Sequence, residues 1–515
     1  MNEIDRQQRL WIARQAEKVA RGTINRREFI RRAALAGFGF ASMRYLAGCA
    51  APAVPPPTPA QVAATAGPAS AMEPTSDMAK WLQDVGGQFK GTTLRVVSES
   101  TPPSRAISEI MQQEFIPLTG INVEWEQLPL DQVLAKISQD TAGGLGLNDI
   151  YYWDQAWIGR FVNDGVDPNE MMAKADLAMP GWDFSDFLQP LVENIATYQG
   201  RVAAIPYDIP IFIMMYRKDV FDELGLAVPT TLDEYMAAIK AINEAKSAEG
   251  IYGTTGQWKS GHYALECNWT AWHWAHGGSI FAPDGSSVVN DERGIEAANY
   301  MLELGKNMPS GATTWDWSGE ADSFTQGSAG VYISWGEFFP AFDDPQKSKI
   351  VGLAESAAVP MEKALRAKSE CGFDETPGMS HQGGSSMAIS KYSKNIDPAW
   401  VFLQWATSAD IVVRASILGG GATPTRKSTF TDPRILENNK VVAGTTRHFA
   451  VTLDAIENRM GTEPHHPAWA ALSVDSFAVE LGKMTTGQQD VQTTLDNMKA
   501  AADKAVAQTK QYSFA

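Results

Sequence analysis

Strand-like and helix-like segments take turns along the chain from residue 93 onward. Residues 93–98 (TLRVVS), 121–126 (INVEWE) and 148–152 (NDIYY) predict short strands, and residues 104–115 and 130–141 between them have the apolar spacing of helices. Strands separated by helices form βαβ units, in which neighbouring strands run parallel. The pattern therefore predicts an α/β fold built on a parallel-rich sheet.

The same pattern continues toward the C-terminus. Thr231 and Glu234 fit a capping box, a pair that opens a helix by satisfying its first N–H groups, and they predict a helix at 232–243. Further strands are predicted at 202–206, 211–216, 329–334 and 385–390, and further helices at 295–304, 397–407 and 491–507. The sequence contains no internal repeat of about 20–50 residues.

Composition and charge limit the class of protein. Of the 515 residues, 44% are hydrophobic and 20% are charged, as in ordinary globular chains and unlike disordered, collagen-like or polytopic membrane proteins. This length predicts about three domains. The formal net charge is −17, and residues 1–49 carry +6, so the remainder carries −23. Such an acidic surface binds a phosphate backbone poorly, so we expect no nucleic-acid partner.

The first 49 residues are typical of an export signal. Arg26 and Arg27, followed by the apolar stretch 33–43, resemble a twin-arginine signal, and the Leu-Ala-Gly-Cys that ends at Cys49 resembles a lipobox, whose cysteine is lipidated. The alternative is a basic amphipathic helix. The twin-arginine pattern and the lipobox occur together in the correct order, which argues against that alternative. Residues 50–77 are rich in Pro, Ala and Thr and predict a tether. We therefore expect a lipid-anchored, extracytoplasmic protein in the periplasm or on the outer face of the cytoplasmic membrane.

Two other cysteines, Cys267 and Cys371, lie in the folded part. Three cysteines in all exclude a disulfide-rich scaffold and a four-cysteine zinc site. In an oxidising compartment the pair forms one disulfide or stays as two buried thiols, and both alternatives remain open because the sequence does not fix their distance.

Four segments in a specific order carry a family resemblance. They are IPYDIPIFIMMYRKDVFDELGLAVPTTLDEY (205–235), FTQGSAGVYISWG (324–336), GGSSMAISKYSKNIDPAWVFLQWATS (383–408) and GGATPTRKSTFTDP (420–433). With them, residues 93–510 resemble the extracellular solute-binding proteins of bacterial ABC importers, of the family 1 or sugar-binding type. The chain departs from the family's usual Tyr-Asn pair at Arg217, and residues 355–382 match no pattern of the family.

The resemblance implies an α/β, two-lobed periplasmic-binding-protein-like fold of type II, with discontinuous lobes, central mixed sheets and a hinge of about three chain crossings. We expect the crossings at 205–210, at 333–336 and near Ser390. The implied boundaries are 1–49 for the signal, 50–77 for the tether, 78–206 with 335–390 for lobe 1, and 207–334 with 391–515 for lobe 2. A ligand cleft is expected between the lobes, because ligand sites favour domain interfaces.

The resemblance also implies the ligand and the partners. The expected ligand is a neutral carbohydrate or polyol, delivered to ABC permease subunits with ATPase subunits behind them. The C–H face of a sugar stacks on aromatic rings, and its hydroxyls bond to carboxylates. Aromatic and acidic residues in the family's cleft-lining segments are therefore predicted to contact the ligand: Trp153, Asp154, Tyr207, Asp208, Trp272, Trp335 and Glu337. We expect a monomer without a cofactor.

Structural roles compete with ligand contact at several positions. Trp272 belongs to a helical stripe that is equally suited to a core, and Trp153 is a candidate for packing between the lobes. Asp154 is equally suited to capping the next helix, and Asp208 to ordering a turn. Trp317 lies in a polar loop that forms either a lid or an ordinary surface turn.

Three other functions compete with solute binding. A secreted glycosidase needs a pair of carboxylates, for which Asp208 and Glu337 are candidates. A surface adhesin or scaffold needs no Trp-lined cleft. Possible metal ligands in one region are His262, Glu266, His273 and His276. We predict no metal site, because zinc requires three or four converging ligands and the crowding by tryptophans favours stacking.

Overall fold

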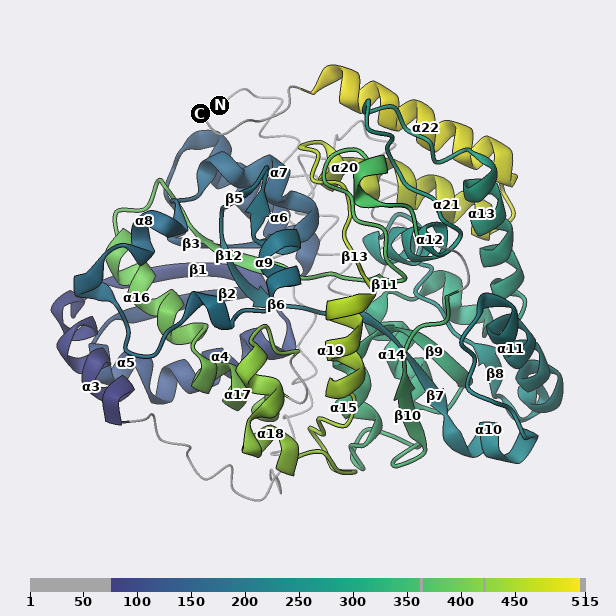
Figure 1. Ribbon diagram of the computed structural model, residues 1–515, viewed down its shortest axis with the longest axis horizontal. Helices are drawn as coiled ribbons and strands as arrows, with labels where there is room; N and C mark the ends of the chain where they lie inside the picture. The colour runs from purple at the N-terminus through teal and green to yellow at the C-terminus, as the bar shows by residue number, and fades with distance from the viewer. Residues whose placement is uncertain (1–75, 362–364, 420–422, 510–515) are drawn as a thin grey trace, which may run out of the picture. The chain divides into compact units, whose positions relative to one another are not determined.

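The computed structural model describes residues 76–361, 365–419 and 423–509. The predicted export signal with its lipidated Cys49, and the predicted tether up to residue 75, lie outside the described residues. Helix α3 (Ser76–Asp84) begins the described part, so residues 76 and 77, predicted as the end of the tether, are helical. The described chain forms two lobes, each built on its own sheet (Figure 1).

The sheet of the first lobe is mixed. Within the described chain its strand order is β2 (Asn122–Leu128), β1 (Thr93–Glu99), β3 (Ile150–Asp154), β12 (Ser385–Ile389) and β6 (Ile205–Asp208). β1 pairs in parallel with β2 and β3, as the alternation of strands and helices predicts. β12 runs antiparallel to both β3 and β6. Every residue of β3 and β12 is buried, because the sheet lies between helices (Figure 1).

Helices from both halves of the chain cover this sheet. They are α4 (Pro102–Gln113), α5 (Phe115–Thr119), α6 (Leu130–Gly143), α16 (Ile396–Ala406) and α17 (Ala409–Leu418). α6 contacts β1, α16 contacts β12, and α17 contacts α4. No single helix in the described ranges is long and apolar enough to cross a membrane. The bent pair α16 and α17 passes that test together, and most of its residues are buried in this lobe.

The second sheet contains strands from the middle of the chain. Its order is β10 (Ala354–Ala357), β7 (Phe212–Arg217), β9 (Ala329–Trp335) and β8 (Tyr252–Thr254). β7 is antiparallel to β10 and β9, and β8 is parallel to β9. All seven residues of β9 are buried, so this strand lies at the centre of the second lobe.

Five further helices belong to the second lobe. They are α11 (Leu232–Lys246), α12 (Tyr263–Ala275), α13 (Glu292–Gly305), α21 (Ala478–Thr485) and α22 (Val491–Gln508). The predicted capping box opens α11, since Thr231 and Glu234 bond each other's backbone N–H groups. α12 packs between α13 and α21, and every one of its residues is buried. Its polar residues are buried together with its aromatic ones, so α12 is a core helix that carries polar groups: Glu266, Asn268, Thr270 and His273.

Shorter elements complete the described part. They are helices α7 (Ile158–Phe161), α8 (Pro168–Met172), α9 (Gln189–Ile195), α10 (Lys218–Leu224), α14 (Trp317–Thr325), α15 (Phe339–Phe342), α18 (Pro433–Glu437), α19 (Phe449–Asn458) and α20 (Trp469–Leu472), and strands β4 (Thr197–Tyr198), β5 (Arg201–Val202), β11 (Ser380–His381) and β13 (Met460–Gly461). β4 pairs with β5, and β11 pairs in parallel with β13.

The first crossing between the lobes lies where the sequence predicts it, between β6 and β7. The second does not. The chain was expected to leave the second lobe at 333–336, but β10 pairs with β7, so residues up to 357 stay in the second lobe. The chain returns to the first sheet just before β12. The expectation was wrong because the short α15 connection returns the chain to the free edge of β7.

The third crossing also differs from the prediction near Ser390. α16 packs on β12 and α17 packs on α4, so the chain after residue 390 stays in the first lobe. The next element to contact β7 of the second sheet is α19, so the return follows α18. The predicted boundaries 335–390 for lobe 1 and 391–515 for lobe 2 therefore misplace β10 and the pair α16–α17. An apolar helix packs where an uncovered sheet face is available, and sequence spacing does not specify which face that is.

Candidate functional site

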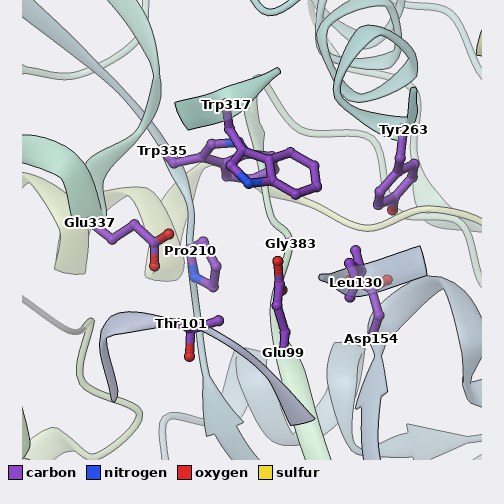
Figure 2. Close-up of a pocket in the computed structure, with 10 residues that line it drawn as sticks. All are labelled: Glu99, Thr101, Leu130, Asp154, Pro210, Tyr263, Trp317, Trp335, Glu337 and Gly383. Carbon is purple, nitrogen blue, oxygen red and sulfur yellow. The ribbon is translucent and has the colours of Figure 1, made fainter. Parts of the chain in front are cut away.

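A cavity opens between the two sheets, with about 400 Å³ of space not filled by atoms, part of it open to solvent. The first lobe, the second lobe and two of the crossings all contribute to its wall (Figure 2). The described residues that line it are Glu99, Thr101, Leu130 and Asp154 from the first lobe, Tyr263, Trp317, Trp335 and Glu337 from the second, and Pro210 and Gly383 from the crossings. Because both lobes supply side chains, a bound solute would bridge them.

Strand ends bring the carboxylates together. Glu99 is the last residue of β1, Asp154 the last of β3 and Asp208 the last of β6. β1 and β3 are parallel, and β6 shares their direction because both β3 and β6 are antiparallel to β12. The carboxyl ends of all three strands therefore lie at one edge of the sheet, which is where open α/β sheets bind ligands.

Asp154 combines the two roles that the sequence left open. Its Oδ1 accepts a hydrogen bond of 2.9 Å from the N–H of Ala156 and so caps the short helical turn that follows. The same side chain lines the cavity. Burial raises the pKa of Asp154 well above its ordinary value, and the nearby carboxylates of Glu463 and Glu99 raise it further, against the effect of the Ala156 bond.

Glu99 points across the cavity. In Figure 2 its carboxylate is directed toward the two indoles on the opposite wall. Burial raises the pKa of Glu99 to about 7, and the charge of Asp208 adds to this effect. A hydrogen bond of 3.3 Å from the Tyr152 hydroxyl and the charge of Arg105 act in the opposite direction.

Two further carboxylates have an oxygen without a partner among the described residues. Asp208 is fully buried, and while its Oδ1 accepts a 2.9 Å bond from the N–H of Ile209, its Oδ2 has no partner. Burial raises the pKa of Asp208 to about 7. Glu337 Oε2 is likewise unpartnered, and burial followed by the charges of Asp208 and Glu99 raises the pKa of Glu337 well above its ordinary value. Asp208 is therefore close to the cavity although it does not line it.

Two indoles form much of the opposite wall. Trp335 ends β9 and donates from Nε1 to Gln257 Oε1 at 3.0 Å, which fixes the plane of the ring. Its ring lies close to the backbone of Gly383, where an added Cβ would come within 3.2 Å of the ring. Trp317 is the first residue of α14 and is half-buried, with its ring 4.7 Å from that of His262.

Tyr263 connects the cavity to a buried polar network. Its hydroxyl donates to Glu463 Oε2 at 2.6 Å and accepts from Gln155 Nε2 at 3.2 Å. Glu463 Oε1 lies 2.9 Å from His381 Nε2. Burial raises the pKa of Glu463, but the hydrogen bonds and charge of His381 and the Tyr263 bond outweigh burial, and the pKa lies below its ordinary value.

Three of the predicted ligand residues lie elsewhere. Trp153 is fully buried and stacks on Phe161 at 6.4 Å, and Trp272 stacks on Tyr235 at 5.8 Å. Tyr207 is buried and donates to a serine hydroxyl at 3.2 Å. None of them lines the described cavity. The reason is clear for Trp153: successive side chains of a strand point to opposite faces, so it points away from the site that its neighbour Asp154 lines.

Sequence reasoning missed several lining residues. Glu99 follows a predicted strand, so the rule that identified Asp154 would have identified it as well. Tyr263 and Trp317 each begin a helix, and no local signal shows that the two helix starts meet at one cavity. Thr101 is the N-cap of α4 and accepts from the N–H of Ser104, so it looks purely structural in sequence. The other missed residues are Leu130, Pro210 and Gly383.

The cysteines and the metal-ligand types can also be placed. Cys267 and Cys371 are both free and buried, so of the two alternatives the structure has the pair of thiols. Among the described residues, one group has ligand atoms of three different side chains within 4.8 Å of one another: Cys267, His381 and Glu463. It contains none of the three histidines and the one glutamate considered from the sequence, and its carboxylate already accepts hydrogen bonds from Tyr263, His381 and Trp469.

Comparisons with known proteins agree with this architecture. The sequence profile of a family described as bacterial extracellular solute-binding protein matches residues 100–412. A Sinorhizobium fredii protein named a probable amino-acid ABC transporter periplasmic-binding protein is 22% identical over 358 residues, which are 68% of this chain and 76% of the relative. The erythritol/L-threitol-binding protein of Mycolicibacterium smegmatis is 24% identical over 363 residues, 66% of this chain and 72% of the relative.

A solved structure shares the fold. It is the ABC transporter solute-binding protein of Agrobacterium radiobacter K84, in complex with ribitol, and it superposes with a TM-score of 0.71 at 24% identity. The match covers 81% of this chain and 99% of that one. The predicted two-lobed α/β fold of the type II periplasmic binding proteins is thereby confirmed.

Proposed function

The chain belongs to the bacterial extracellular solute-binding proteins, and from this premise we propose that it captures a carbohydrate or polyol between its lobes and delivers it to the permease of an ABC importer. The cavity carries the proposal, because Glu99 and Asp154 of the first lobe face Trp317 and Trp335 of the second (Figure 2). Carboxylates accept hydrogen bonds from hydroxyls, and indoles stack on C–H surfaces. A polyhydroxylated solute satisfies both walls at once.

Two of the compared proteins support a small ligand. The mycobacterial relative is named for erythritol and L-threitol, and the Agrobacterium structure holds ribitol. We therefore propose a short polyol or a monosaccharide rather than a long oligosaccharide.

Closure of the lobes would complete capture. A solute that contacts both walls binds the closed arrangement better than the open one, and so shifts the population toward the closed form. The closed form would then dock on permease subunits, with ATP hydrolysis supplied by partner subunits. We propose that the protein does no chemistry on its ligand.

We further propose that the protein works as a monomer that is held at the membrane. Its export by a twin-arginine signal and its lipid at Cys49 rest on the sequence alone. Replacing Cys49 by alanine would release the protein from the membrane fraction if the anchor is correct. A variant with unchanged partitioning would contradict the anchor and leave solute capture untouched.

Incubation of the purified protein with sugars, polyols and amino acids tests the function. The proposal expects that a sugar or polyol raises the melting temperature and is recovered unchanged by mass spectrometry. Consumption of the solute would instead favour a glycosidase, for which the buried carboxyls of Asp208 and Glu337 are the candidate pair. A shift with amino acids alone would contradict the proposed ligand class.

A further inference from the structure

The cavity has many hydrogen-bond acceptors and few free donors. Its described lining contains the carboxylates of Glu99, Asp154 and Glu337 and no lysine, arginine, histidine, asparagine or glutamine side chain. Two of its donors, the Trp335 indole N–H and the Tyr263 hydroxyl, are already used within the protein. A hydroxyl of a polyol both donates and accepts, whereas an ammonium only donates, through three N–H groups. The lining therefore complements an ammonium better than it complements hydroxyls alone.

A fourth carboxyl lies directly behind this wall. Asp208 is fully buried, its Oδ2 has no partner among the described residues, and its charge acts on both Glu99 and Glu337. A buried acceptor without a donor is costly, and proteins usually satisfy such groups. The charge of this buried carboxyl adds to the negative potential that Glu99 and Glu337 place at the wall of the cavity.

The protein supplies little positive charge of its own here. Arg105 is the cation that acts on Glu99, Asp208 and Glu337, but its side chain is exposed and its Nη1 donates to the backbone oxygen of Ser100 at 2.6 Å. Solvent screens an exposed charge strongly. On the facing lobe, Lys259, four residues before Tyr263, is already paired with Asp316 at 3.1 Å.

The aromatic wall suits a cation as well. Trp317 and Trp335 present indole surfaces to the cavity, and Tyr263 adds a phenol (Figure 2). Aromatic faces attract ammonium groups, and tryptophan does so most strongly. Carboxylates on one wall and indoles on the other would thus surround an ammonium with complementary groups.

We propose that the ligand is an amine-bearing polyhydroxylated solute, an amino sugar or an amino polyol, whose ammonium lies beside Glu99 and Glu337. This inference rests on the proposed function and narrows its ligand class. The hydroxyls of the solute would use the remaining carboxylate oxygens, and its carbon chain would lie against Trp317 and Trp335. Burial raises the pKa of all four carboxyls, and a bound ammonium would favour their ionised forms.

Calorimetry on the whole protein with matched pairs of solutes tests the inference. Each pair shares a skeleton and differs in one group: glucosamine against glucose, glucamine against glucitol, and the corresponding four- and five-carbon amino alditols against their alditols. N-acetylglucosamine removes the charge and keeps the nitrogen. We expect at least one amine to bind ten times or more tighter than its hydroxyl counterpart at neutral pH, with that advantage lost on acetylation.

Substitutions test which carboxylate binds the ammonium. Glu337→Gln should weaken binding of the amine at least tenfold and weaken binding of its hydroxyl counterpart less. Glu109→Gln, an exposed glutamate on α4, serves as the control and should change neither. If the neutral solute binds as tightly as the amine or tighter in every pair that binds, the proposed amine ligand is wrong, and the proposed capture of a sugar or polyol is unaffected. No binding of any sugar, polyol or amine by a protein that binds amino acids would overturn both.

Discussion

The hydroxyl of Tyr263 donates a hydrogen bond of 2.6 Å to Glu463 Oε2, so a residue of the cavity wall is held by a buried carboxylate. Gln155 joins the same pair from the first lobe: its Nε2 donates to the Tyr263 hydroxyl, and its Oε1 accepts from the N–H of Glu463, both at 3.2 Å. These bonds connect the two lobes beside the ligand cavity. We expect these bonds to break when the lobes separate.

Replacing Gln155 by alanine should therefore favour the open arrangement. We expect faster ligand dissociation and a larger radius of gyration in the presence of ligand, because the closed form loses two hydrogen bonds between the lobes. Stopped-flow kinetics and small-angle scattering measure these effects. Gln132→Ala, an exposed glutamine on α6, is the control. If the two variants dissociate at the same rate, the bonds of Gln155 do not hold the lobes.

Trp317→Ala should reduce ligand affinity with little loss of stability. The ring lines the cavity but is only half-buried, so its removal leaves a small void. We expect at least a tenfold rise in Kd, which is about 1.4 kcal/mol. Calorimetry gives the affinity, and thermal melting gives the stability.

Trp153→Ala is the matched comparison, because this ring is fully buried away from the cavity. Loss of such a core side chain costs about 3–5 kcal/mol of unfolding free energy. The protein that remains folded should bind with nearly unchanged affinity. The reverse pattern, with affinity lost in Trp153→Ala and kept in Trp317→Ala, would refute the assignment of the site.

The ligand-free protein should become less stable as the pH rises toward neutrality. The pKa of Glu99 is raised from 4.5 to about 7, and that of Asp208 from 3.8 to about 7. Between about pH 4 and 7 the folded state therefore keeps protons that the unfolded chain releases, so the contribution of these groups to the unfolding free energy falls as pH increases. The substitution Glu99→Gln removes one of these two titrating carboxyls.

Thermal melting from about pH 5 to about pH 8 measures this dependence. We expect the melting temperature of the wild type to fall more steeply across this range than that of Glu99→Gln. Glu109→Gln should follow the wild type. An identical slope in wild type and Glu99→Gln would mean that Glu99 titrates alike in the folded and unfolded chain.

Both thiols of the folded part should be found reduced. Cys267 is fully buried and Cys371 is nearly so, and burial raises the pKa of each, that of Cys371 to about 12. Alkylation without reductant should modify both residues in denaturant and leave Cys267 unmodified in the native protein, as read by peptide mass mapping. A non-reduced peptide pair that links the two cysteines would contradict the structure.

Local patterns predicted the strands and helices well because their causes are local. The alternation of strands and helices predicted β1, β2 and β3 and their parallel pairing, and Thr231 with Glu234 predicted the start of α11. The return of the chain to β7 through β10 was missed, because it depends on which strand edge is free in three dimensions.

Part of the cavity lining was predicted for the same reason. Asp154 and Trp335 end strands, and a strand end can be recognised in sequence. Trp153 was misplaced because the alternation of side chains along β3 puts it on the other face from Asp154. Trp317 begins a helix far along the chain from β3, and only tertiary packing brings it to the cavity.

β12 lies between β3 and β6, yet it is the last of the five strands of its sheet to leave the ribosome. A nascent chain released up to residue 380 contains every strand of the second sheet, whereas the first sheet still has a gap at its centre with two unpaired strand edges. Such edges invite pairing with other chains. The sheet of the amino-terminal lobe is therefore completed only after the sheet of its partner, and synthesis that stalls or stops before β12 should yield aggregation-prone fragments.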